Sequence, residues 1–145
     1  MKNILVSACL LGEPCRYDGK SKPCERVIAL KNTYNLIPIC PEVMGGLPTP
    51  RTPSEICGER VLMKDGRDVT ENYNRGAQKA LEIARENACT VAILKEKSPS
   101  CGSGLIHNGS FDGGLVKGDG ITTQLLKQNG IRVLGESEIT ENFAL

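Results

Sequence analysis

Short apolar runs alternate along this chain with longer stretches of helical periodicity, and this alternation limits the possible folds more than any other feature. The four apolar runs lie at 4–6, 36–39, 91–94 and 131–134. Strands that alternate with helices are typical of βαβ units, in which neighbouring strands run parallel. We therefore expect an α/β protein of three layers, with helices on both faces of a mainly parallel sheet, in a flavodoxin-like or Rossmann-like arrangement.

The helical stretches are marked by their spacing and their end residues. Small and apolar residues recur within 71–87 at the spacing of one helix face, and Thr70 is a suitable N-cap. A helix is also predicted at 22–34, and another begins at 122 or 123 and ends at Gly130. These three helices would supply the outer layers of the fold.

Glycine and proline interrupt the pattern in two places. Residues 41–60 are rich in both and predict an ordered loop, and 102–120 form a second, glycine-rich stretch. Between 60–63 and Val69, the pair Asp65-Gly66 predicts a small inserted β-hairpin. With 145 residues the chain is long enough for one core, so we expect a single domain over 1–145.

Charge and composition exclude several classes of partner. The net charge is +1 and only five residues are aromatic, which argues against a nucleic-acid surface. No apolar run reaches the roughly 18 residues of a membrane span. Residues 6–9 resemble a lipoprotein cleavage box, but the eight residues before Cys9 are too few for a signal peptide. These observations predict a cytoplasmic protein that binds neither nucleic acid nor membrane.

Seven cysteines are an unusual number for a cytoplasmic chain, and an odd count fits a disulfide framework poorly. Cys9, Cys40 and Cys101 each follow one of the predicted strands. Ligands of open α/β sheets bind in the crevice outside the carboxyl ends of the strands. We therefore expect these three thiols to meet at one metal centre, with Cys15 as the alternative to Cys9.

The spacing of the cysteines favours one kind of metal centre. Structural zinc sites use paired ligands two to four residues apart. The closest cysteine pair here is Cys9 and Cys15, and His107, the single histidine, is predicted on the surface or in a loop. Three dispersed thiolates suit an iron–sulfur cluster with one iron left open to substrate. Zinc, and buried thiols without a metal, remain alternatives at this point.

Several short motifs together resemble one bacterial family. They are Ser-Ala-Cys-Leu-Leu-Gly at 7–12, Cys-Arg-Tyr-Asp-Gly at 15–19, Cys-Pro-Glu at 40–42, Gly-Gly at 45–46, Pro-x-Pro-Arg at 48–51, Ser-Pro-Ser-Cys-Gly at 98–102 and Gly-Asp-Gly-Ile-Thr at 118–122. The chain resembles the domain-of-unknown-function 523 family, which includes thiouracil desulfidases. The resemblance runs from Ile4 to about Leu134, nearly the whole chain.

The resemblance implies an activity and a set of ligands. It implies a [4Fe–4S] cluster on Cys9, Cys40 and Cys101, with the fourth iron free to bind substrate sulfur. The implied reaction removes sulfur without redox chemistry from a thiolated base such as 2-thiouracil, giving the oxo base and hydrosulfide. In this scheme Glu42 is the acid/base group, and Ser98 or Ser100 positions the substrate.

The residues near the cysteines support part of this scheme independently of the resemblance. Glu42 is two residues from Cys40, so its carboxylate can reach the same space and activate water. Arg16, Asp18 and Arg51 are expected either to bind the small thiolated base or to pair with each other. The alternatives are a non-catalytic metal- or sulfur-binding protein and a thiol redox protein that uses Cys9 and Cys15. Oligomeric state has no signature in the sequence.

Overall fold

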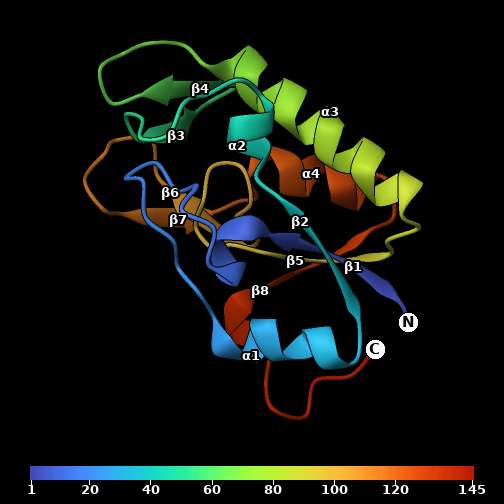
Figure 1. Cartoon of the computed structure of the whole chain (residues 1–145). Helices are drawn as coiled ribbons and strands as arrows, with labels where there is room; N and C mark the ends of the chain where they lie inside the picture. Colours follow the sequence, from blue (N-terminus) through green and yellow to red (C-terminus); the bar gives the residue numbers. More distant parts are fainter.

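A four-stranded parallel sheet forms the centre of the molecule, as the computed structural model of residues 1–145 shows. Its strands are β1 (Asn3–Ser7), β2 (Asn35–Ile39), β5 (Val91–Leu94) and β8 (Arg132–Gly135), in the order β2-β1-β5-β8 (Figure 1). Every neighbouring pair is parallel, with Leu5 opposite Ile37 and Ala92 opposite Val133. The predicted mainly parallel α/β sheet is thus confirmed.

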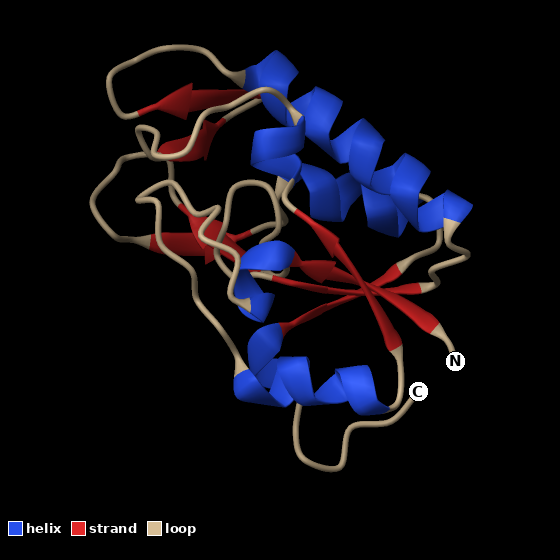
Figure 2. Cartoon of the chain, viewed as in Figure 1, coloured by secondary structure: helices blue, strands red, loops and turns tan.

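Helices cover both faces of this sheet (Figures 1 and 2). One face carries α2 (Pro41–Met44), α3 (Thr70–Glu86) and α4 (Ile121–Gln128), and the other carries α1 (Glu25–Ala29). Successive residues of β1 point to opposite faces, so Leu5 packs in the α3–α4 core while Ile4 and Val6 pack in the α1 core. None of the helices combines the length and apolar content needed to cross a bilayer.

Proline explains two details of the secondary structure. The predicted helix at 22–34 is shorter than expected: α1 begins at Glu25, and its last turn is a 3-10 helix over Leu30–Asn32. Pro23 holds Lys22 out of the helical region, so the helix cannot begin at 22 as predicted. Pro38 lies within β2 without disturbing the sheet, because β2 is an edge strand and its proline needs no partner on the open side.

The long helix α3 begins one position earlier than its predicted cap implies. Thr70 was expected to be the N-cap, but it is the first residue of the helix. Asp68 takes over the capping role, since its Oδ1 accepts a hydrogen bond from the Thr70 backbone N–H at 2.9 Å. The Thr70 hydroxyl instead accepts the Val61 N–H at 2.9 Å, which ties the helix to the neighbouring hairpin. At the far end of α4, Gly130 has a positive φ of 79°, as expected for a helix end.

Two antiparallel hairpins lie at the end of the sheet where the strands finish (Figure 1). In the first, β4 (Arg60–Met63) pairs with β3 (Ser54–Cys57), so its main partner precedes it in the sequence. The expected return through Val69 adds only an isolated bridge, between Leu62 and Asp68. The predicted turn at Asp65-Gly66 and its antiparallel return are therefore present, but the main partner of β4, the strand β3, was not predicted.

The second hairpin, formed by β6 (Leu105–His107) and β7 (Leu115–Lys117), falls in the stretch 102–120 that was expected to be a glycine-rich loop. Its strands have three residues each, and all of β7 is exposed. Strands of three residues, one of them fully exposed, are too short for the sequence to reveal an alternating pattern.

A close helix contact fixes the start of α2. Gly76 of α3 faces the backbone of Pro41, and a Cβ at position 76 would lie only 2.7 Å from the Pro41 carbonyl carbon. Only glycine permits this approach, because every other residue would place a Cβ inside the contact distance. The contact holds the first turn of α2, and with it Cys40 and Glu42 on either side of Pro41.

Candidate active site at the carboxyl ends of the strands

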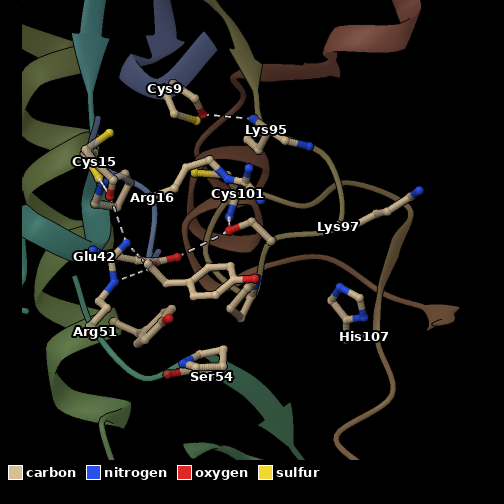
Figure 3. A pocket seen from close by; sticks show the side chains of 18 of the residues that line it. Cys9, Cys15, Arg16, Glu42, Arg51, Ser54, Lys95, Lys97, Cys101 and His107 are labelled. Atoms are coloured by element: carbon tan, nitrogen blue, oxygen red, sulfur yellow. Dashed lines mark hydrogen bonds and ion pairs between the residues drawn. The ribbon is translucent and has the colours of Figure 1, made fainter. Parts of the chain in front are cut away.

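A cavity of about 410 Å³ opens where the central strands end, and its wall includes residues of the sheet and of the hairpin strands β3 and β6. This volume lies within the range of small-molecule sites. Four of the seven cysteines are in its wall, together with Glu42, Ser98 and Arg51. Figure 3 shows Cys9, Cys15 and Cys101 around the same space, with Glu42 and Arg51 beside them.

The order of elements explains why distant cysteines meet. Cys9 lies in the 3-10 turn Ala8–Leu11 that follows β1, and Cys40 follows β2 as the N-cap of α2. Cys101 lies in the loop after β5, which is the other neighbour of β1. The three strands are adjacent and parallel, so their carboxyl ends bring the three thiols to one cavity.

Cys15 contributes a fourth thiol. Its side chain lies next to the thiols of Cys40 and Cys9, and both influence its pKa. Its backbone carbonyl also accepts a hydrogen bond from the Cys40 Sγ at 3.7 Å. The geometry therefore keeps both Cys9 and Cys15 available as the first ligand of a metal. The other three cysteines lie outside the cavity wall: Cys24, Cys57 and Cys89.

The environment of these thiols favours the protonated form. Burial raises the pKa of Cys101 to about 12. The hydrogen bond with Cys15, together with burial, raises the pKa of Cys40 far above the usual range. At Cys15 the hydrogen bond with Cys40 lowers the pKa, but the bond with Cys9 and burial outweigh it and raise the pKa to about 11. Without a metal, these thiols are protonated and weak nucleophiles at neutral pH.

An ion pair with Arg51 fixes Glu42. The Arg51 Nε donates to the Glu42 Oε2 at 2.9 Å, and only 3% of the Arg51 side chain is exposed. Burial alone would lower the pKa of Arg51, but the charge of Glu42 outweighs it and raises this pKa. The Arg51 Nη2 also donates to the Cys15 carbonyl at 3.1 Å. The guanidinium thus joins the carboxylate to the cysteine loop and pairs with neither Arg16 nor Asp18. Arg51 lines the cavity, and its expected contact with substrate stays a prediction.

Ser98 completes a hydrogen-bonded chain with Glu42. Its hydroxyl donates to the Glu42 Oε1 at 3.5 Å. The Ser98 Oγ also accepts the backbone N–H groups of Ser100 and Cys101, each at 3.1 Å. Two amides thus hold the serine oxygen, and its proton points toward the carboxylate.

Ser100 is placed differently from Ser98. It is 1% exposed, is absent from the cavity wall, and its hydroxyl shares a hydrogen bond of 2.8 Å with that of Thr122. Its position ties the loop after β5 to the start of α4. Of the two serines considered from the sequence, only Ser98 faces the cavity.

The remaining charged residues divide in a similar way. Arg16 lines the cavity, and its guanidinium lies 5.8 Å from the centre of the Tyr17 ring. Asp18 is exposed, lies outside the cavity wall and accepts the Lys20 N–H at 3.0 Å. The side chain of Lys95 at the cavity wall is paired with Glu136 at 2.8 Å.

The cavity wall also includes residues that the sequence analysis did not assign to the site, among them Glu55, Tyr73, His107 and Phe111. His107, expected on the surface or in a loop, belongs to β6, is half-buried, and its Nδ1 has no hydrogen-bond partner (Figure 3). Burial is the main cause that raises the pKa of Tyr73 far above its usual range. Three of these residues lie on or beside the hairpins, whose approach to the sheet has no local sequence signal.

Comparison with known proteins places the chain in a family. A family model described as 2-thiouracil desulfurase matches residues 4–138. The protein YbbK of Bacillus subtilis, named as uncharacterized, is 44% identical over 95% of this chain and 98% of its own. A solved structure named [4Fe-4S]-dependent thiouracil desulfidase TudS is 48% identical with a TM-score of 0.91, over 96% of this chain and 93% of the other. This chain belongs to the 2-thiouracil desulfurase family.

Proposed function

We propose that this protein is a [4Fe–4S]-dependent desulfidase that converts a thiolated pyrimidine such as 2-thiouracil into the oxo base and hydrosulfide. One observation carries the proposal: Glu42 and Ser98 are hydrogen-bonded to each other on the cavity wall that four cysteines share. The family and the name of the solved relative support the same reaction class.

The donor set fits an iron–sulfur cluster. Thiolates are the usual ligands of such clusters, and the cavity offers Cys9, Cys40 and Cys101 from three adjacent strand ends, with Cys15 close to the first two. When bound by only three thiolates, the cluster supplies one open iron as a soft Lewis acid for the substrate sulfur. Cluster binding would replace the protons that these thiols hold.

The chain's own residues supply the acid–base chemistry. Net hydrolysis exchanges the C=S sulfur for a water oxygen: a C–O bond forms, the C–S bond breaks, and sulfur leaves as hydrosulfide with no change of oxidation state. The Glu42 carboxylate accepts a proton from the attacking water, as a general base within hydrogen-bond reach of the cavity. Ser98 holds the Oε1 of Glu42 and aligns the carboxylate.

Arg51 holds the carboxylate of Glu42 in place. It donates to Oε2, which leaves Oε1 for Ser98 and for water. It also donates to the Cys15 carbonyl, so the base and the cysteine loop hold one position relative to each other. This pre-organisation is the protein's contribution to catalysis, since the groups need no rearrangement when the substrate arrives.

The thiol environment disfavours the redox alternative that uses Cys9 and Cys15. Redox-active cysteines have lowered pKa values, because the thiolate is the attacking species. The pKa of Cys15 is raised to about 11. The hydrogen bond with Cys40 lowers this pKa, but the bond with Cys9 and burial together raise it by more. This environment suits a thiol whose proton is displaced by a bound metal better than a thiol that attacks a disulfide.

Anaerobic reconstitution followed by turnover tests the proposal. The wild type should hold about four irons and release hydrosulfide in step with the loss of the 2-thiouracil absorbance. Glu42→Gln should keep the cluster and lose turnover, whereas a non-catalytic binding protein would show no turnover in either form. A colourless protein that converts 2-thiouracil in the presence of an iron chelator would contradict the cluster mechanism.

A cysteine series identifies the ligands. Serine replacement of a true ligand should abolish cluster loading, so Cys40→Ser and Cys101→Ser should lose iron. Cys9→Ser and Cys15→Ser, compared side by side, decide which thiol is the third ligand. Cys89→Ser is the matched control, because Cys89 is buried in the α3–α4 core, away from the cavity.

A further inference from the structure

The loop that joins β6 and β7 is held against β3 by one carboxylate. Glu55 Oε1 accepts the backbone N–H of Gly109 at 2.9 Å and that of Phe111 at 3.2 Å. The Cys57 Sγ donates to the Gly109 carbonyl at 3.4 Å. Gly109 lies so close to β3 that a Cβ there would be 2.7 Å from the Ile56 carbonyl oxygen. The loop tip is therefore fixed at the rim of the cavity.

Glu55 is an unusual residue for a structural contact. It is only 8% exposed, and it takes part in none of the ion pairs of the protein. A buried carboxylate is costly unless hydrogen bonds replace its hydration, and the two loop amides do so. Glu55 thus depends on the loop as much as the loop depends on Glu55.

Phe111 is the residue that this contact constrains most. Its φ is +55°, in the left-handed region that a phenylalanine rarely adopts and that costs free energy. Its ring lines the cavity, yet it belongs to none of the three hydrophobic clusters of the core. An aromatic ring has thus been placed at the cavity by a strained backbone, with no core packing to account for it.

Aromatic residues are rare in this chain, and they are concentrated at this cavity. The chain has only five aromatic residues, and three of them line this one cavity: Tyr17, Tyr73 and Phe111. Tyr73 is buried in the cluster beneath the hairpins, and the ring of Tyr17 has Arg16 over it. The ring of Phe111, unlike the other two, is neither part of a core cluster nor covered by an arginine.

We propose that Phe111 is the stacking surface for the planar base of the substrate, and that Glu55 is a positioning residue that holds this ring at the cavity. The proposal deepens the proposed function and rests on it. A thiolated pyrimidine is flat and carries its N–H, C=O and C=S groups on the ring edge, so its two faces are available for contact with an aromatic ring, which contributes to binding. Stacking leaves the thiocarbonyl edge free to face Glu42, Ser98 and the thiols.

Two substitutions separate the ring from the backbone. Glycine adopts a φ of +55° without strain, so Phe111→Gly should keep its thermal midpoint while it loses the ring. For Phe111→Gly and Phe111→Leu, the Kd and KM for 2-thiouracil should rise about tenfold, with iron content retained. Phe143→Leu is the matched control, because Phe143 packs against the α1 core. This variant should bind 2-thiouracil as the wild type does.

The Glu55 variants test positioning. Glu55→Gln keeps an acceptor oxygen and should hold the loop, whereas Glu55→Leu should release it, so that the Gly109 and Phe111 amides exchange faster with deuterium. Glu55→Leu should raise KM much more than it lowers kcat, and Glu55→Gln should restore most of the affinity. A loss of kcat with unchanged KM would overturn the positioning role.

Equilibrium dialysis with 2-thiouracil and with uracil keeps this inference separate from the proposed reaction. If the wild type binds 2-thiouracil without converting it, the desulfidase proposal fails, and the Kd values of the Phe111 variants still decide the stacking role. Phe111→Gly binding as tightly as the wild type overturns the stacking role. A wild type that neither binds nor converts 2-thiouracil overturns both.

Discussion

Replacement of Gly76 by alanine tests how closely the α2–α3 contact controls the catalytic carboxylate. A Cβ at this position would lie 2.7 Å from the Pro41 carbonyl carbon and closer still to its oxygen. The carbon–carbon distance has to grow by at least about 0.8 Å to reach the roughly 3.5 Å of van der Waals contact, and the shorter contact with the oxygen requires a larger shift. Because the obstacle is backbone on both sides, no side-chain rotation relieves it, and the first turn of α2 has to move.

Two opposing terms set the change in stability. Alanine is favoured over glycine in a helix interior by about 1 kcal/mol, and Gly76 lies in the middle of α3. Overpacking of a tight contact costs about 1–3 kcal/mol. We therefore expect the free energy of unfolding to change by no more than about 2 kcal/mol, so the variant should fold.

Activity should respond far more strongly than stability. Glu42 follows Pro41 directly, and a misplacement of about 1 Å can lower a rate about a hundredfold. Turnover of 2-thiouracil and the thermal midpoint, measured together, check this expectation. Gln78→Ala is the control, since Gln78 lies on the exposed face of the same helix. Higher stability of Gly76→Ala with full turnover would refute the reasoning, because it would show that α2 absorbs the shift without moving Glu42.

Two further predictions concern stability. Ala88 has a φ of 51° just after α3, a position that suits glycine, so Ala88→Gly should raise the free energy of unfolding by about 0.5–1 kcal/mol, measured by urea denaturation. Burial raises the folded-state pKa of Cys101 from 9.0 to about 12. The folded, reduced and cluster-free protein therefore binds the Cys101 proton more tightly than the unfolded chain does. Its free energy of unfolding should keep this contribution below about pH 9 and lose it toward pH 12, by up to about 1.4 kcal/mol per pH unit. Urea unfolding at several pH values should show this slope in the wild type and a shallower one in Cys101→Ala; equal slopes would argue against the raised pKa.

Local sequence patterns were sufficient for the central sheet and its helices. The apolar runs predicted all four strands. The central strands β1 and β5 are buried on both faces and need uninterrupted apolar runs, whereas the edge strand β2 is only partly buried. The small and apolar spacing within α3 likewise predicted the helix to within one residue of its observed bounds. The positions of Cys9, Cys40 and Cys101 followed from the strands, since a residue just past a parallel strand lies at the carboxyl edge of the sheet.

Long-range contacts decided the rest of the cavity. Arg51 is nine residues from Glu42, and its pairing with that carboxylate, rather than with Arg16 or Asp18, depends on the path of the loop between them. Ser98 and Ser100 are equivalent in the sequence, but one faces Glu42 and the other Thr122. No local pattern records which way such a side chain points.

The sequence by itself determined a parallel α/β sheet and the three strand ends where cysteines gather. The tertiary structure alone decided that Cys15 joins them, that Arg51 fixes Glu42, and that the β6–β7 hairpin brings His107 and Phe111 to the cavity. The physical reason is one of range: hydrophobic periodicity acts over a few residues and is written in the chain. A hydrogen bond between Glu55 and Phe111, 56 residues apart, exists only once the fold has brought them together.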